Sequence, residues 1–555
     1  MKTIKLFFLS QGLFACLLLC SISLIAQEIK VSSNNTTTLD EGEAKIAINP
    51  ADSNKMAFGF MQISSTQGNT FQIYTSANAG NTWQKSGFIP ASLLLKDFPN
   101  YTSIAGGGDI LMAYDKTGKL YCSWIYVISN HALQNPYDSL IWASYWGSSI
   151  DNGHTFTLEP GDAHFFGKGK FGLSTTGVYD IYNVWDGICD RDWMAVDLTN
   201  GPNANKLYIA YINYTQYRSD GLKVRSKASG DKTFSNQVMA YQGLGQLSNI
   251  MVDGNGMLHY IFADLSSNKL GHVSSSDGGK SFSLIHSISD AGLLIPTSFY
   301  INTRENAAPS LAIDGANNLH VVWNDFIDGG FPKSYYSKSN DGGLSWLQTS
   351  LDISKKFNGN VFMPTVSAIN NRVSISAYVL DDNKKSEFYI VSSNDYGQSF
   401  SPPFKVSTAL TDFNLIGKDI FIGDYTSSAR TNCLVYGVRT DARTKGQKLY
   451  VSKFNDCAAW GIQEITPINA TYSLENLYPV PAHDFLNLDL NSEIADQISI
   501  DIMDVQGKII SSEKEIVSTG KNVFSINVVQ LAAGNYLLKM VNKHNVYLTR
   551  MFAKK

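Results

Sequence analysis

Four short segments of the sequence place arginines beside carboxylates or a phenol, the groups that bind and cleave polar ligands. A guanidinium holds a carboxylate through a planar pair of hydrogen bonds, and a carboxyl or phenol group can act as a nucleophile or a proton donor. The segments are CDRDW with Arg191 and Asp192, TRENAAPS with Arg304 and Glu305, GDYTSSAR with Asp424, Tyr425 and Arg430, and VRTDAR with Arg439. Salt bridges and loop caps are the alternative interpretation of each of these residues.

Residues 160–193 form the longest interruption of an otherwise regular pattern, and they carry Tyr179, Tyr182 and Trp185. Long loops on rigid scaffolds often hold binding sites, and exposed aromatic rings can stack on the apolar faces of sugars. These three residues are therefore candidate ligand-binding residues. Asp424 and Arg430, from the GDYTSSAR segment, are further candidates for binding. A packed insertion that covers a central channel explains the same segment equally well.

The elements that must position these residues follow from an internal repeat. A turn of the form Ser-x-Asp-x-Gly-x-Ser/Thr-aromatic recurs at 76–83, 149–156, 275–282, 339–346 and 393–400, and a shortened copy lies at 229–234. Asp and Ser side chains stabilise tight turns, and Gly accepts positive φ. Each copy therefore predicts a β-hairpin in which the carboxylate has a structural role. The carboxylates are those of Asp151, Asp277, Asp341 and Asp395.

A second hairpin, made of an apolar strand, an Asp or Asn turn and an alternating strand, precedes most copies of this turn. Examples are LMAYDKTGKLYCSW (111–124) and LAIDGANNLHVVW (311–323). Two hairpins make a four-stranded unit, and six such units plus a seventh at 421–454 can be counted. The pattern predicts an all-β fold, a β-propeller of seven blades. A β-sandwich array and a β-helix are the alternatives.

The repeated turn resembles the Asp-box, or BNR repeat, of the sialidase-like β-propellers over roughly residues 40–455. The resemblance implies six blades as the alternative to seven, and turns that lie away from the active face. It also implies a Tyr–Glu nucleophile pair, for which Tyr425 and Glu305 are the candidates, and an acid from Asp192 or Asp109. Sialidases bind their substrate through three arginines, one of them before the first Asp-box, whereas this chain has no arginine before Arg191. A sialidase-like hydrolase, a polysaccharide lyase and a non-catalytic propeller that binds glycans or proteins all remain open.

The C-terminal segment has a different pattern of alternating strands, which predicts a small β-sandwich. Its YPVPA (478–482), DVQGK (504–508) and LAAGNYLLK (531–539) segments and its basic end resemble the sorting domain of the type IX secretion system. That resemblance implies export by this machinery, to the medium or the outer cell surface. The expected organisation is a propeller over 27–455, a linker over 456–475 and the sorting domain over 476–555.

Composition limits the remaining functions. Lys2 and Lys5 precede an apolar run that ends at Ala26, so residues 1–26 are expected to be a cleaved signal peptide, with no transmembrane span in the mature chain. A net charge of −4 gives no basic surface for nucleic acid. The expected partner is an extracellular glycan or glycoprotein. No metal site or cofactor is expected, with a structural calcium left open.

Four cysteines follow the signal segment, and their proximity in sequence favours pairing Cys122 with Cys189 and Cys433 with Cys457.

Overall fold

The computed structural model describes residues 26–33, 39–64, 69–87, 95–101, 103–129, 140–173, 179–215, 218–289, 304–305, 308–326, 332–347, 350–416, 421–457, 472–504, 509–542 and 547–555. Within strands and their margins, some side chains lie outside this description. The expected signal peptide lies outside the described residues except for Ala26. The described chain forms two compact units, Gln27–Lys453 and a second that contains Phe454–Lys555. No helix among the described residues is both long and apolar enough to cross a membrane.

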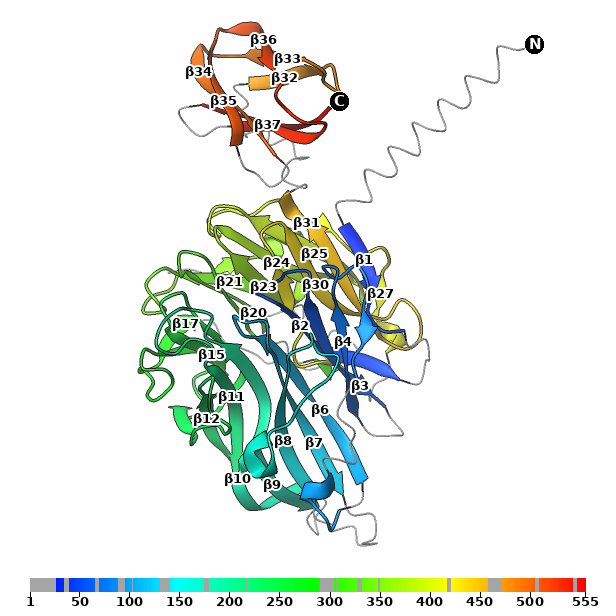
Figure 1. Cartoon of the computed structure of the whole chain (residues 1–555), viewed down its shortest axis with the longest axis vertical. Coiled ribbons are helices and arrows are strands. Elements are labelled where there is room, and N and C mark those ends of the chain that lie inside the picture. The colour runs from blue at the N-terminus through cyan, green and yellow to red at the C-terminus, as the bar shows by residue number, and fades with distance from the viewer. Residues whose placement is uncertain are drawn as a thin grey trace, which may run out of the picture. The chain divides into compact units, whose positions relative to one another are not determined.

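The larger unit is built from antiparallel sheets, mostly of four strands, as the hairpin pattern predicts (Figure 1). One sheet contains β2 (Asp40–Ile48), β3 (Met56–Ile63), β4 (Thr70–Ser76) and β5 (Gln84–Lys85); the next four-stranded sheet contains β14 (Gly245–Val252), β15 (Leu258–Asp264), β16 (Lys269–Ser275) and β17 (His286–Ser289). Two further sheets contain β19 (Ser310–Ile313), β20 (Leu319–Phe326), β21 (Pro332–Ser339) and β22 (Leu351–Asp352), and β23 (Asn360–Ile369), β24 (Arg372–Leu380), β25 (Lys385–Ser393) and β26 (Phe404–Lys405), with β27 (Thr411–Asp412) beside β25. These sheets are of the kind that make propeller blades.

The N-terminal strand joins the last strands of this unit in one sheet. Its strand order is β1 (Ala26–Lys30), β31 (Lys448–Asn455), β30 (Leu434–Asp441) and β29 (Ser428–Arg430). A short parallel pair joins β18 (Arg304–Glu305) to β28 (Phe421–Gly423). The short helices are η1 (Leu95–Asp97), η2 (Gly161–His164), α3 (Ser354–Phe357) and η3 (Phe413–Leu415).

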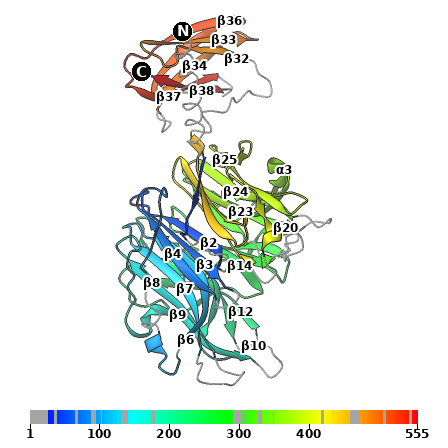
Figure 2. The ribbon, with the colours of Figure 1, turned by 90° about the vertical axis from the view of Figure 1, so that its right-hand side faces the viewer.

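The strands between residues 103 and 241 form one continuous eight-stranded sheet (Figure 2). It contains β6 (Ser103–Tyr114), β7 (Leu120–Ser129), β8 (Leu140–Ser149), β9 (Phe165–Leu173), β10 (Tyr179–Val196), β11 (Leu207–Thr215), β12 (Arg218–Lys227) and β13 (Val238–Tyr241). The long strand β10 makes this continuity possible, because its first part pairs with β9 and its second part, from Ile188, pairs with β11. The segment interpreted as a long loop or insertion is thus largely a β-hairpin of the sheet.

Ser and Asp side chains form hydrogen bonds with the backbone of the hairpin turns, as the repeat predicts. In the turn at 339–346, the Ser339 hydroxyl donates to Asp341 Oδ1 at 2.7 Å and accepts from the Gly343 amide at 2.8 Å. Asp341 Oδ1 also accepts from the Ser345 amide at 2.9 Å. The same three bonds recur in the turns of Asp151, Asp277 and Asp395, and also in the first copy, where Asn78 replaces the Asp.

The first strands of several sheets share an irregularity at the same level. A β-bulge interrupts the pairing of β2 with β3, β6 with β7, β14 with β15 and β23 with β24. At these bulges Glu43, Asp109, Leu247 and Met363 adopt φ values of 49°, 48°, 47° and 46°. A bulge with one left-handed residue re-aims a side chain, so the repeated backbone turns equivalent side chains in equivalent directions. Two of these four positions carry carboxylates.

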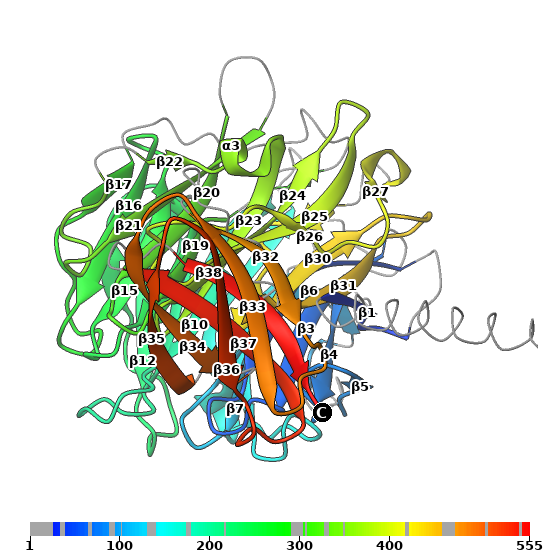
Figure 3. The same ribbon diagram turned by 90° about the horizontal axis from the view of Figure 1, so that it is seen from above.

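The smaller described unit is a sandwich of two antiparallel sheets (Figure 3). One sheet contains β32 (Tyr472–Tyr478), β33 (Phe485–Ser492) and β36 (Gly520–Asn527), and the other contains β34 (Asp496–Met503), β35 (Ile509–Val517), β37 (Gly534–Asn542) and β38 (Tyr547–Lys554). Alternate residues of the strands form its core, including Leu486, Leu488, Leu490, Ile498, Ile500 and Ile502. The predicted β-sandwich is therefore found.

The cysteines divide into two kinds. Cys433 and Cys457 are disulfide-bonded, whereas Cys122 and Cys189 remain thiols. The expected Cys122–Cys189 disulfide is wrong because the two sulfurs pack in different hydrophobic clusters. Cys122 lies with Met112 and Trp124, and Cys189 lies with residues of β11.

Candidate functional site

A cavity of about 670 Å³ opens over one face of the eight-stranded sheet. Apolar side chains two residues apart line it because they share one face of their strands. They are Ile125 and Val127 from β7, Leu140 and Trp142 from β8, and Ile188 from β10. The Trp142 indole is held in place, since its Nε1 donates to the Cys189 carbonyl oxygen at 2.9 Å.

The floor of this cavity is the small-residue run Ala105–Gly108 of β6. The two central glycines have different reasons to lack a side chain. A Cβ on Gly107 would lie 2.8 Å from the Ile125 carbonyl oxygen and 2.8 Å from the Tyr126 ring, so packing excludes it. A Cβ on Gly106 would meet nothing closer than the Asn69 carbonyl oxygen at 3.8 Å. Packing therefore tolerates a side chain at Gly106, and its absence leaves the cavity open.

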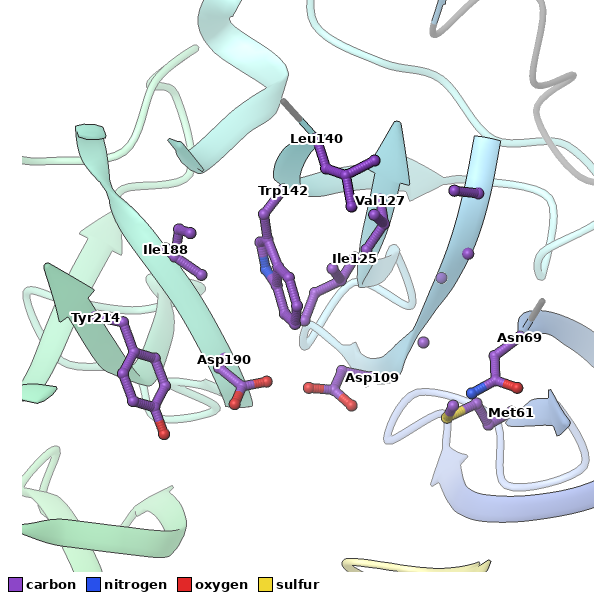
Figure 4. A pocket seen from close by; sticks show the side chains of 14 residues that line it. Met61, Asn69, Asp109, Ile125, Val127, Leu140, Trp142, Ile188, Asp190 and Tyr214 are labelled. Carbon is purple, nitrogen blue, oxygen red and sulfur yellow. The ribbon is translucent and has the colours of Figure 1, made fainter. Parts of the chain in front are cut away.

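Two carboxylates face each other across the end of the cavity. Figure 4 shows the Asp109 and Asp190 carboxyl groups pointing toward each other, with Tyr214 beyond Asp190. Asp109 comes from the bulge of β6, and Asp190 comes from β10, where Asp190 is the last residue paired before the strand's own bulge. Burial, followed by the nearby carboxylates of Glu43, Asp190, Asp192 and Asp424, raises the pKa of Asp109 well above its ordinary value. Both effects favour the protonated form of Asp109.

Further acidic groups, those of Asp192 and Tyr425, surround Asp109. Burial raises the pKa of Asp192 to about 7, against the effect of the Ser123 hydroxyl, which donates to Asp192 Oδ2 at 2.5 Å. Burial and the surrounding carboxylates also raise the pKa of the Tyr425 phenol. The Tyr425 ring packs edge-on against Trp193 with centroids 5.5 Å apart, and its hydroxyl has no hydrogen-bond partner among the described residues. Tyr425 is therefore a neutral phenol in an acidic environment.

Glu43 and Asp424 complete this acidic group by holding backbone in place. Glu43 Oε1 accepts from the Asp424 amide at 2.8 Å, and the Asp424 carbonyl oxygen accepts from the Ala308 amide at 2.9 Å. The negative charges of Glu43 and Asp424 disfavour the ionised form of Asp109. Among the described side chains, no cluster of three or more His, Cys, Asp and Glu residues has the arrangement of a metal site.

The structure brings together three of the predicted site residues, Asp192, Asp424 and Tyr425, and adds the alternative acid Asp109. Glu305 approaches them through its backbone, because it pairs with Gly423, two residues before Tyr425. The side chains of Arg191, Arg304, Glu305, Tyr179, Tyr182 and Trp185 lie outside the described part of the structure.

Two predicted arginines have other roles. Arg430 donates to Ser374 Oγ at 2.7 Å and to the carbonyl oxygens of Thr431 and Asn432. Arg439 is fully buried on β30 and forms ion pairs with Asp441 and with Glu28 of the N-terminal strand. This placement does not support a catalytic role for Arg439, since its guanidinium is occupied in fixing β1 to the sheet.

The sequence motifs indicate Asp109 only as an alternative acid, and they do not point to Glu43, Trp142 or Tyr214. An alignment of the first strands with one another does point to Glu43 and Asp109. When the first strands are aligned at their turn residues Asn49, Asp115, Asp197 and Asp253, the position six residues earlier holds Glu43, Asp109, Arg191 and Leu247. No such register points to Trp142 or Tyr214, which reach the cavity only because β8 and β11 lie in the same extended sheet as β6.

Comparison with known families and proteins identifies the C-terminal unit. Residues 476–554 match the model of the secretion system C-terminal sorting domain. No curated protein matches the chain.

Solved structures resemble the chain at low identity. An ulvan lyase of polysaccharide lyase family PL25, bound to a glucuronic acid–sulfated rhamnose saccharide, has a TM-score of 0.41 at 10% identity, with 78% of this chain and 96% of that chain covered. A protein of unknown function from Dyadobacter fermentans has a TM-score of 0.40 at 11% identity, with 66% and 98% covered. A Hadza microbial sialidase has a TM-score of 0.38 at 12% identity, with 74% and 75% covered.

The sorting domain settles where the protein acts. A C-terminal domain of this kind directs its chain to the type IX secretion machinery, as the YPVPA and LAAGNYLLK segments predict. The protein is therefore exported by type IX secretion and is secreted or located at the cell surface.

Proposed function

We propose that residues 27–455 form a β-propeller of seven blades, joined through 456–475 to the sorting domain at 476–555. The support is a closed cycle of contacts among the first strands of successive sheets. β2 contacts β6, β6 contacts β10, β10 contacts β14, β14 contacts β19, β19 contacts β23, β23 contacts β29, and β29 contacts β2. In this arrangement β1 completes the last blade as its outer strand, and the first strands surround a central channel.

We further propose that the propeller is a glycoside hydrolase that acts on an extracellular glycan. The observation that carries this proposal is the opposed pair Asp109 and Asp190 at the end of an aromatic-lined cavity. Glycosidases use two carboxyl groups, one protonated and one ionised, on either side of the scissile bond. Burial and neighbouring negative charge favour the protonated form of Asp109, which suits the general acid that protonates the leaving oxygen. Asp190 then serves as the ionised partner, as nucleophile or as the base that activates water.

The lining favours a neutral glycan over sialic acid or a uronate. The described side chains that line the cavity include two carboxylates and neither lysine nor arginine. Among these described side chains, a substrate carboxylate would face the Asp190 carboxylate, and like charge disfavours its binding. The same argument disfavours a lyase that must neutralise a uronate carboxylate. Trp142 and Tyr214 offer apolar ring faces for stacking a neutral sugar.

Tyr425 is a weaker candidate nucleophile in this arrangement. Its phenol would have to lose a proton in an environment that raises its pKa through burial and nearby carboxylates. The Tyr425–Glu305 pair expected from the sialidase resemblance therefore stays an alternative, in which Glu305 would act as the base.

The test is a screen of the purified protein against neutral glycosides, sialosides and uronate polysaccharides. We expect turnover of a neutral glycoside that falls by about 10²–10⁴-fold in Asp109→Asn and in Asp190→Asn. Asp151→Asn is the matched control, because this carboxylate lies in an exposed turn. Turnover of sialosides, formation of unsaturated uronates, full activity in Asp109→Asn, or glycan binding without any turnover would each refute the hydrolase assignment.

A further inference from the structure

A second cavity, of about 300 Å³, lies among the first strands of the sheets. Residues of β2, β6, β10, β14, β19, β23 and β29 all line it, so it occupies the channel of the proposed propeller. We call it the channel cavity. The described lining of the channel cavity contains Lys45 and Arg430 and no carboxylate. It therefore differs in charge from the lining of the Asp109–Asp190 cavity, which contains two carboxylates.

Lys45 is the most unusual of these residues. Its ammonium lies 4.0 Å from the centroid of the Trp193 ring, a cation–π contact. Part of the side chain is exposed, but it lines the channel cavity, and its surroundings are dry enough that burial lowers the Lys45 pKa to about 7. A charged amine in such a place is costly unless a counter-charge or polar groups share the space.

Polar groups with unused hydrogen-bonding capacity line the same cavity. Asn249 and Ser367 are 4% and 6% exposed, and Asn249 Oδ1, Ser367 Oγ and Ser428 Oγ have no hydrogen-bond partner among the described residues. They come from three different strands, β14, β23 and β29. Buried polar groups are almost always satisfied by protein, water or a ligand, so these orphaned groups indicate an occupant of the channel.

We propose that the channel cavity binds a small inorganic anion of the halide type, held by the Lys45 ammonium and by the hydroxyls of Ser367 and Ser428. The Asn249 side chain can donate to the same ion through its amide group, since the oxygen and nitrogen of an amide exchange places on a flip. Much of the remaining lining is apolar, from Met112, Ala195 and Met251. Such a lining favours a weakly hydrated monoanion over phosphate or sulfate, because the cost of dehydration rises steeply with charge. This site is independent of the proposed hydrolase activity.

Trp193 provides a local reporter, because an ion bound to Lys45 would lie close to its indole. The experiment titrates the full-length protein with bromide, a heavy-atom quencher, and takes the Trp193 signal as the difference between the native protein and Trp193→Phe. We expect saturable quenching that added chloride reverses, that equimolar sulfate does not reverse, and that Lys45→Met abolishes. Lys206→Met is the matched control, since Lys206 also lies over an aromatic ring, that of Tyr208, but does not line the channel cavity. It should leave the quenching unchanged.

Circular dichroism shows whether Lys45→Met has folded, and bromide anomalous diffraction from crystals of the native protein gives a second measurement that needs no variant. A bromide peak beside Lys45 supports the proposal. Quenching that is linear and insensitive to chloride, quenching that persists in folded Lys45→Met, or crystals with no anomalous peak in the channel would overturn it. Reversal by sulfate as strong as that by chloride would refute the preference for a halide. None of these outcomes depends on turnover of a glycoside.

Discussion

Substitution of Asp341 tests whether the repeated turn carboxylates support the fold or take part in chemistry. Asp341 accepts hydrogen bonds from the Ser339 hydroxyl and the Ser345 amide through Oδ1, and from the Ser345 hydroxyl through Oδ2. Asp341→Ala removes all three. A hydrogen bond contributes about 0.5–1.5 kcal/mol net, and water replaces part of the loss because the turn is exposed. We therefore expect Asp341→Ala to lower the free energy of unfolding by about 1–3 kcal/mol.

Asp341→Asn should behave differently, because the chain already contains this variant at an equivalent position. In the first copy, Asn78 Oδ1 accepts from Ser76 at 3.0 Å and from the Thr82 amide at 2.9 Å, and Asn78 Nδ2 donates to the Thr82 hydroxyl at 2.9 Å. All three bonds of the turn survive with an amide. We expect Asp341→Asn to cost less than about 0.5 kcal/mol.

The assay is equilibrium urea unfolding followed by tryptophan fluorescence, with glycoside turnover measured on the same preparations. Ser339→Ala serves as a positive control, because this buried hydroxyl accepts the Gly343 amide, and the loss of such a partner costs about 1–3 kcal/mol. Equal destabilisation by Asp341→Asn and Asp341→Ala would show that the charge, rather than the hydrogen-bond geometry, stabilises the turn. Loss of turnover in a variant with unchanged stability would refute the structural role altogether.

Four further predictions follow from single contacts. Burial raises the Asp341 pKa, but hydrogen bonds from Ser345 and Ser339 outweigh it and hold the pKa below its ordinary value, so the ionised carboxylate adds a small stabilisation above about pH 4, within the roughly 0.5 kcal/mol expected for Asp341→Asn. This contribution is lost as the pH falls through the lowered pKa, and the stability difference between the native protein and Asp341→Asn should disappear there in acid-unfolding curves. Arg439→Met removes the buried cation shared by Glu28 and Asp441, which keep only the partly exposed Arg443 as ion-pair partner, and should cost about 3 kcal/mol, whereas Arg439→Met combined with Glu28→Gln and Asp441→Asn should recover much of this loss in urea unfolding. Gly106→Ala should leave the unfolding curve unchanged but raise the KM for a glycoside, while Gly107→Ala should destabilise the protein by about 1–3 kcal/mol because its methyl group meets the Ile125 carbonyl oxygen. Tyr425→Phe removes a buried hydroxyl without a described partner, so stability should stay constant or rise, and unchanged turnover would rule out Tyr425 as the nucleophile.

The sequence predicts the architecture well because turn chemistry is local. Asp115 illustrates this, since its carboxylate accepts from the amides of Thr117 and Lys119, two and four residues away. Such contacts depend only on residue type and spacing, and they mark the hairpins of most sheets. The same locality explains why the C-terminal strands could be placed from alternation alone.

The candidate site is less predictable because its parts meet only through sheet order. Asp109 and Asp190 belong to β6 and β10, which contact each other directly although β7, β8 and β9 lie between them in the sheet order. The prediction of a loop at 160–193 missed this, since the eighteen residues of β10 serve two neighbouring strands in turn. Arg439 illustrates the opposite case, in which a polar cluster in the sequence forms an ion-pair network that holds β1, while its catalytic role stays an untested prediction.

Comparison of the four β-bulges distinguishes features that the fold requires from features of the candidate site. Left-handed φ costs about 1–2 kcal/mol for a residue with a side chain, and such strain often marks an active site. Here, however, Leu247 and Met363 carry the same strain as Glu43 and Asp109, with φ values that span only 46–49°. The strain is thus a property of the repeated first strand and is no evidence of chemistry by itself. What distinguishes the four bulges from one another is the residue type. Carboxylates stand at the bulges of β2 and β6, and apolar side chains stand at those of β14 and β23, where Leu247 and Met363 are almost fully buried. A scaffold requirement alone would accept apolar residues at all four positions. Glu43 has a structural role as well, because it accepts the Asp424 amide, whereas Asp109 lines the cavity opposite Asp190, where the proposed hydrolase function gives its carboxyl group a role.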